Sequence, residues 1–169
     1  MVSKHQIGRL QMVKPGGSEL HQLIYVSRAL PPTLSNLPAE IESILATAVP
    51  NNIKLEITGA MVAHDGWFLQ LLEGPEHQLY ELFKEICLDP RHIDVTIMSE
   101  GPVMTREFGD WSMCAAQLSK VDAKIVEKLN LKPDFDPSKS SAKLLVSLLK
   151  TIVGVQKATG QSASRTASV

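Results

Sequence analysis

The stretch ITGAMVAHDGWFLQLLEG, residues 57–74, decides the fold class because it has the pattern of a β-hairpin. Two apolar runs flank Asp65-Gly66, a dipeptide typical of a two-residue type I′ turn, in which both central residues need positive φ. A turn of this length predicts that Met61 lies opposite Gln70. Because side chains alternate along a strand, one face of the hairpin then carries Ile57, Gly59, Met61, Ala63, Phe68, Gln70 and Leu72. Gln70 is the only polar side chain on that face.

Gln70 needs hydrogen-bond partners, because burying an unpaired amide costs roughly 1–3 kcal/mol. Its own face offers only methyl groups, a thioether and an aromatic ring. The strand predicted over residues 20–27 places Tyr25 on one face with Leu23 and Ser27, so a phenol can meet the amide. One interpretation is a buried Tyr25–Gln70 pair that satisfies only its own members. The other is a pair that also contacts a ligand.

The order of the predicted elements gives the fold class. A first strand, 20–27, is followed by the loop RALPPTLSN and by a helix that Ser35 or Asn36 caps and Pro50 ends. The hairpin, 55–74, leads into a second helix that begins at Pro75 and ends at Pro90. Strands in HIDVTIMSEGPV and FGDWSMCAAQL follow. We expect an α+β fold, a ferredoxin-like β-α-β-β-α-β-β mixed sheet with two helices on one face.

Four ranges divide the chain of 169 residues. We expect a flexible lead-in over 1–18, the main domain over 19–118, a helical extension over 119–156 and a disordered tail over 157–169. The extension has helical patterns at 121–130 and 140–155. The second of these carries an apolar stripe, which predicts that it packs on the open face of the sheet: Leu144, Leu145, Leu148, Leu149, Ile152 and Val153.

Composition excludes several classes of protein. A net charge of −1 without a basic block argues against a nucleic-acid-binding surface. No apolar run has the length of a signal peptide or a membrane span. Cys87 and Cys114 lack the spacing of a metal or redox motif, and we interpret them as free core thiols. We therefore expect a cytoplasmic protein without a metal site, a membrane contact or a nucleic-acid partner.

Polar side chains gather at the ends of both predicted helices. Asn51 and Asn52 follow the first helix, and Asp89, Arg91 and His92 follow the second. Each group alone is typical of a helix end and the turn after it. Together they surround an apolar slot over the sheet. Such a slot suits a flat heteroaromatic ligand with a polar chain.

Several segments in this order resemble the BLUF domain, a family of flavin-binding blue-light sensors: LIYVSRA, NN, ITGAMV, FLQLLEGP, LYELFKEICLDPRH and REFGDWSM. The resemblance covers over half of the chain. It implies a flavin between the two helices, usually FAD, with FMN and riboflavin as alternatives. The cofactor-binding residues that it implies are Tyr25, Ser27, Ile44, Asn51, Asn52, Phe68, Gln70, Lys84, Ile86, Asp89, Arg91 and His92. Some relatives carry a basic residue next to the ring where this chain has Lys84-Glu85.

The resemblance also implies a photochemical mechanism. Tyr25 would give an electron and a proton to the excited flavin by way of Gln70, whose amide then takes a different orientation or tautomer. Trp111 and Met113 match the W-x-M of the family's last strand, where one of the two is expected to exchange contact with Gln70. The plainer interpretation of these two residues is ordinary core packing.

Two other classes of function compete with the photosensor. We expect a protein that is not an enzyme and that signals through an unidentified protein partner or through a change in a homo-oligomer. A flavin-dependent oxidoreductase is one alternative, although the sequence shows no dinucleotide fingerprint or candidate base for it. A ferredoxin-like binding module without flavin is the other, because a fold alone does not fix function.

Overall fold

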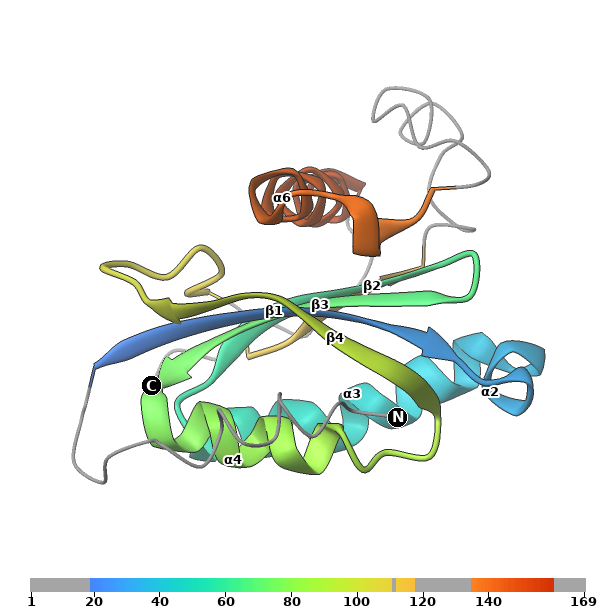
Figure 1. Ribbon diagram of the computed structural model, residues 1–169, viewed down its shortest axis with the longest axis horizontal. Coiled ribbons are helices and arrows are strands. Elements are labelled where there is room, and N and C mark those ends of the chain that lie inside the picture. The colour runs from blue at the N-terminus through green and yellow to red at the C-terminus, as the bar shows by residue number, and fades with distance from the viewer. Residues whose placement is uncertain (1–18, 111, 118–134, 160–169) are drawn as a thin grey trace.

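The computed structural model describes residues 19–110, 112–117 and 135–159. In these ranges a five-stranded sheet lies between two helical layers (Figure 1). The strands are β1 (Leu20–Ala29), β2 (Thr58–His64), β3 (Trp67–Pro75), β4 (His92–Pro102) and β5 (Cys114–Gln117). The helices are α2 (Pro31–Ser35), α3 (Leu37–Lys54), α4 (Glu76–Ile86) and α6 (Ala142–Thr159), with a short 3-10 helix, η2, at Pro137–Lys139.

The strand order is β4-β1-β3-β2-β5, and the sheet is mixed. β1 lies antiparallel to β3 and β4, and β2 lies antiparallel to β3. β5 pairs with β2 in parallel, which is what a strand that returns over a long connection can do. The expected ferredoxin-like α+β architecture is therefore confirmed.

The hairpin has the predicted register. Asp65 and Gly66 have φ values of 45° and 76°, as a type I′ turn requires. Met61 lies opposite Gln70 across β2 and β3, and Tyr25 lies opposite Gln70 across β1 and β3. Gln70 is thus the centre of a three-residue row across the sheet, with a thioether on one side and a phenol on the other.

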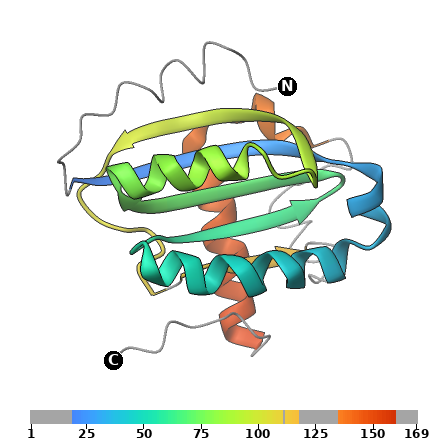
Figure 2. The same ribbon diagram turned by 90° about the horizontal axis from the view of Figure 1, so that it is seen from below.

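Each face of the sheet has its own core. α3 and α4 run alongside the strands on one face, whereas α6 crosses the strands on the other (Figure 2). The α6 face is closed by apolar side chains from both layers, including Val26, Leu69 and Leu71 from the sheet and Leu145, Leu148, Leu149, Ile152 and Val153 from the helix. The expected packing of this stripe is confirmed, except that Leu144 is 52% exposed.

The prediction that Pro50 ends the first helix is wrong. α3 continues to Lys54 with Pro50 inside it. Pro50 has no N–H to donate to the carbonyl of Ala46, four residues earlier. Both residues are exposed, so water can bind that carbonyl instead. The extra turn is fixed from outside the helix, because the Ile57 N–H donates to the Asn52 carbonyl at 2.8 Å. Asn52 consequently lies within the last helical turn.

Other boundaries also differ from the expectations. The predicted loop RALPPTLSN contains α2, which begins with two prolines at positions that need no N–H donor. Asn36 precedes α3 without a side-chain capping bond, and α4 begins at Glu76 and ends before Pro90. β5 begins only at Cys114, and α6 extends into the range expected as a disordered tail. The predicted lead-in 1–18 and the helix 121–130 lie outside the described residues.

Candidate functional site

A cavity of about 230 Å³ opens between α3, α4 and the sheet. α3 contributes Ile44, Thr47, Ala48, Asn51 and Asn52, and α4 contributes Leu82, Glu85 and Ile86. The sheet side contributes Tyr25, Met61, Phe68, Gln70, Leu72, His92 and Met113, and the connection after α4 contributes Asp89 and Arg91. The lining is therefore apolar between the helices and polar at both helix ends.

Gln70 connects two side chains at the sheet side of this cavity. The Tyr25 hydroxyl donates to Gln70 Oε1, and Gln70 Nε2 donates to Met113 Sδ at 3.4 Å. All three residues are buried. A thioether is a weak acceptor, and an amide nitrogen carries two N–H donors. Gln70 can therefore offer a stronger hydrogen bond to a ligand than it makes to Met113.

The phenol of Tyr25 is held in its neutral form. Burial raises the pKa of Tyr25 well above its ordinary value, and the nearby Cys87 and Asp89 raise it further. Burial also raises the pKa of the Cys87 thiol to about 11, so this free cysteine is protonated at neutral pH. The ring of Tyr25 packs against Phe83, with 5.4 Å between ring centroids. Tyr25 thus keeps its proton until something in the cavity removes it.

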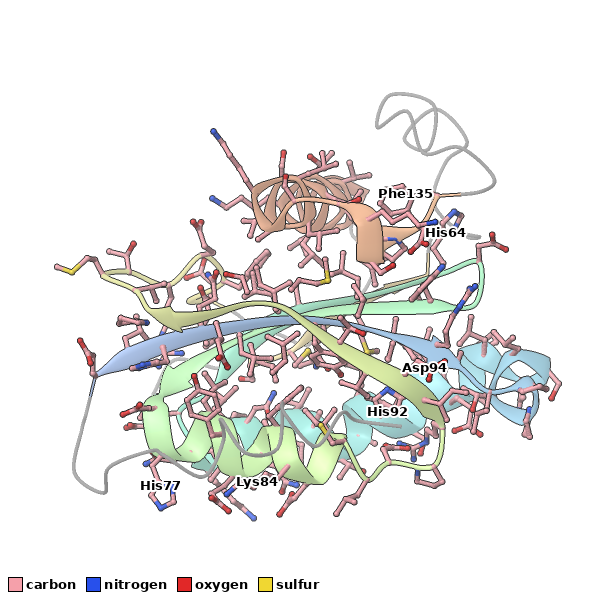
Figure 3. All side chains as sticks on the ribbon, in the orientation of Figure 1. His64, His77, Lys84, His92, Asp94 and Phe135 are labelled. Carbon is pink, nitrogen blue, oxygen red and sulfur yellow. The ribbon has the colours of Figure 1, made fainter. Side chains whose placement is uncertain are left out.

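Ser27 positions His92 and does not line the cavity. His92 Nε2 lies 2.8 Å from the Ile86 carbonyl, which can only accept, so this nitrogen carries the proton. His92 Nδ1 then accepts from the Ser27 hydroxyl at 2.7 Å. His92 lies on the α3 and α4 side of the sheet (Figure 3). These two bonds fix the imidazole at the cavity wall.

Arg91 and Lys84 differ in their relation to the cavity. Arg91 lines the rim, and its guanidinium makes ion pairs of 2.9 Å with both Glu40 and Asp89. Lys84 does not line the cavity; its ammonium pairs with Glu81 at 2.6 Å on the exposed side of α4. Figure 3 shows Lys84 pointing away from the sheet. The structure thus brings Arg91 to the site and leaves Lys84 outside it.

Asn52 has an unsatisfied polar atom. Its Nδ2 donates to the Ser112 carbonyl at 2.6 Å, which joins α3 to the segment before β5. Its Oδ1 is buried and has no partner among the described residues, and the same holds for Ser112 Oγ. A buried acceptor without a donor is costly and needs an explanation. A ligand with an N–H group in the cavity would supply one for Asn52.

Sequence reasoning missed six residues of the lining. Met61 and Leu72 lie on the predicted hairpin face, and Leu82 and Ala48 have helical spacing, so the sequence could have revealed them. Thr47 and Glu85 carried no such signal. Met113 lies against Gln70, whereas Trp111, the other expected switch residue, lies outside the described part of the chain.

Known proteins similar to this chain share its fold and segments of its sequence. The family model BLUF, described as sensors of blue light using FAD, matches residues 20–114. The photoactivated adenylate cyclase subunit beta of Euglena longa is 36% identical over 102 residues, which are 60% of this chain and 12% of that protein. The blue light- and temperature-regulated antirepressor BluF of Escherichia coli strain K12 is 34% identical over 74 residues, 44% of this chain and 18% of that protein. The chain spans less than a fifth of either relative.

Two solved structures extend the comparison beyond the matched sequence. The dark state of BlrB, a BLUF protein, superposes with a TM-score of 0.66 at 30% identity and covers 83% of this chain and 99% of that one. The photo-activated state of BlsA gives a TM-score of 0.68 at 25% identity, with 79% and 94% covered. In the described ranges, no helix combines the length and apolar character that a membrane span requires, and no three metal-binding side chains group together. Since the family match takes in more than half of the chain and most of the cavity lining, the chain belongs to the BLUF family of blue-light sensors that use FAD.

Proposed function

We propose that the cavity between α3 and α4 holds the flavin ring and that light rearranges the hydrogen bonds of Gln70. The observation that carries this proposal is the buried row of hydrogen bonds from Tyr25 through Gln70 to Met113 at the cavity wall. A row in which one amide lies between a phenol and a weak acceptor has two arrangements of similar packing. Such a pair of states is what a switch requires.

The residues present fit a flavin. The pyrimidine edge of the ring carries an N–H between two carbonyls, and Asn52 Oδ1 is a buried acceptor without a donor among the described residues. Ile44 from α3 and Ile86 from α4 provide apolar walls for the ring. Asp89, Arg91 and His92 supply polar groups at the rim for the ribityl chain, with Asn51 and Phe68 completing the predicted contacts. The placement of Lys84 and Ser27 outside the lining argues for indirect roles.

The chemistry of Tyr25 and Gln70 supports coupled transfer of an electron and a proton. When bound, a light-excited flavin supplies a strong electron acceptor. A phenol that loses an electron becomes a strong acid, so the Tyr25 proton moves along its existing bond to Gln70 Oε1. When the electron and the proton both return to Tyr25, the amide can settle in a different orientation or tautomer. Gln70 then presents different donors to Met113 and to the cavity.

We also propose how this sensor transmits its signal. A BLUF domain is a sensor, and we propose that this chain has no enzymatic activity of its own. It would act on a separate protein in the cytoplasm, or through a change in self-association. α6 supports this proposal because it covers the sheet face opposite the cavity, where it can report a change in the sheet. The flavin oxidoreductase remains the second candidate, and one experiment separates the two.

Purified protein loaded with FAD is expected to be yellow and to shift its absorption to longer wavelength under blue light. The shift should reverse in darkness without net reduction of the flavin, because the transferred electron and proton return. Absorption spectra before, during and after illumination measure both quantities. Steady oxidation of a nicotinamide in darkness, with no reversible shift, would instead indicate an oxidoreductase.

Replacing Asn52 with alanine should weaken flavin binding about tenfold, since one buried hydrogen bond contributes roughly 1.4 kcal/mol. Flavin fluorescence during titration of the apoprotein measures the dissociation constant. Asn36→Ala is the matched control, because this asparagine before α3 is exposed, makes no side-chain capping bond and does not line the cavity. Equal losses in both variants would contradict the assignment of the ring contact to Asn52.

A further inference from the structure

Glu73 is a buried carboxylate that does not line the cavity. It lies on β3, three positions after Gln70, so its side chain points to the opposite face of the sheet, on the α6 side. The residue is 0% exposed. Its two oxygens accept three hydrogen bonds, from Gln22 Nε2 at 3.0 Å, the Glu107 N–H at 2.8 Å and the Phe108 N–H at 3.0 Å. Two of the three donors belong to the connection between β4 and β5.

Arg106 fastens the same connection to the sheet. Its guanidinium donates to the Glu73 carbonyl at 2.6 Å and to Thr58 Oγ1 at 2.9 Å. It also donates to the Glu56 carbonyl at 2.7 Å. We call residues 106–108 the anchor segment. Both the side chain and the main-chain carbonyl of Glu73 accept hydrogen bonds from it.

The anchor segment also contacts α6. Phe108 is 3% exposed and packs in the core that α6 closes, together with Leu145 and Leu149. Glu107 makes an ion pair with Lys150 of α6. The connection that follows β4 lies on the same side of the sheet as this helix (Figure 1). A displacement of the anchor segment would thus act directly on α6.

The other end of the same connection lies at the cavity. Ser112 accepts from Asn52, and Met113 accepts from Gln70. Only a few residues of chain separate these contacts from the anchor segment. We infer that Glu73 is a positioning residue that fixes the anchor segment on the sheet. Because the anchor segment is fixed, a movement of Met113 displaces α6 instead of only deforming the connection between β4 and β5. This inference rests on the proposed function of Gln70 and Met113.

A carboxylate is suited to this role because it only accepts hydrogen bonds. An amide at the same place would turn an NH₂ group toward at least one of the three donors. The Glu73→Gln variant should therefore free one backbone N–H of the anchor segment and leave the cavity lining intact. The glutamine has the same shape, so the core around it keeps its packing.

Light-minus-dark hydrogen exchange on the flavin-loaded protein tests the inference. The wild type is expected to change exchange in peptides that cover 142–155 when illuminated. In Glu73→Gln the absorption shift should remain, whereas the exchange difference in α6 should fall by about threefold or more, because the anchor segment opens locally. Glu42→Gln, an exposed carboxyl on α3, is the matched control and should behave as the wild type.

A purely structural role for Glu73 would lower stability in darkness and light alike and leave the α6 response unchanged, which would overturn the inference. A wild type that shifts its absorption without any response in α6 would also overturn it. If Glu73→Gln does not fold, Glu73→Asp replaces it, since the shorter side chain keeps the charge but withdraws from Glu107 and Phe108. Absence of the absorption shift in the wild type would instead refute the proposed function.

Discussion

Replacing Gln70 with leucine is expected to abolish the light-induced red shift while the protein still binds flavin. Leucine keeps the volume of the side chain but removes both the acceptor for Tyr25 and the donor to Met113. Flavin binding should persist because Asn52, Ile44 and the polar rim are unchanged. The flavin content of the purified variant and its light-minus-dark absorption spectrum measure the two effects separately.

Gln78→Leu is the control for this prediction. Gln78 is a partly exposed residue of α4 that does not line the cavity. Its replacement therefore tests the effect of a glutamine-to-leucine change away from the flavin site. Its spectrum should match that of the wild type. A reversible red shift of normal amplitude in Gln70→Leu would show that the amide is not the switch.

Replacing Tyr25 with phenylalanine should lower the yield of the red-shifted state by roughly 100-fold or more, the lower range expected when a proton-transfer group is removed. The ring can still pack against Phe83, but the hydroxyl proton that Tyr25 donates to Gln70 Oε1 is absent. The quantum yield of the shifted state, measured under calibrated blue light, gives the effect directly.

The second tyrosine of the chain provides a matched control. Tyr80 is also buried, but it contacts His21 and does not line the cavity. Tyr80→Phe therefore removes a phenol from the core without removing the proposed donor. An equal loss of yield in both variants would point to general damage to the fold, and an unchanged yield in Tyr25→Phe would exclude it as the donor.

The sequence predicted the hairpin and its unusual residue because both depend on local rules. Asp65-Gly66 determines the turn, and the turn determines the register of the two strands. The register then shows that Gln70 is a polar residue on an otherwise apolar face. The same rule applies to Glu73, which shares the other face with Leu69 and Leu71. Two of its three partners could not be predicted, because they are backbone N–H groups of a connection more than 30 residues further along.

Other features depend on contacts that sequence spacing does not encode. α3 passes Pro50 because its last turn is held by the Ile57 N–H and by Ser112. Lys84 and Ile86 are two positions apart on α4, which places them on different sides of the helix. Only the orientation of α4 on the sheet decides which side faces the cavity. The resemblance to a family supplies a set of residues, whereas packing determines which of them reach the ligand.

The side-chain amide of Gln70 can be observed directly by NMR in flavin-loaded protein with ¹⁵N-labelled glutamine, with the signal assigned by its loss in Gln70→Leu. If light rearranges this amide, its signal should move under blue light and return in darkness at the rate at which the absorption shift decays. An amide signal that stays in place while the flavin absorption shifts would show that the Gln70 amide does not rearrange in the light.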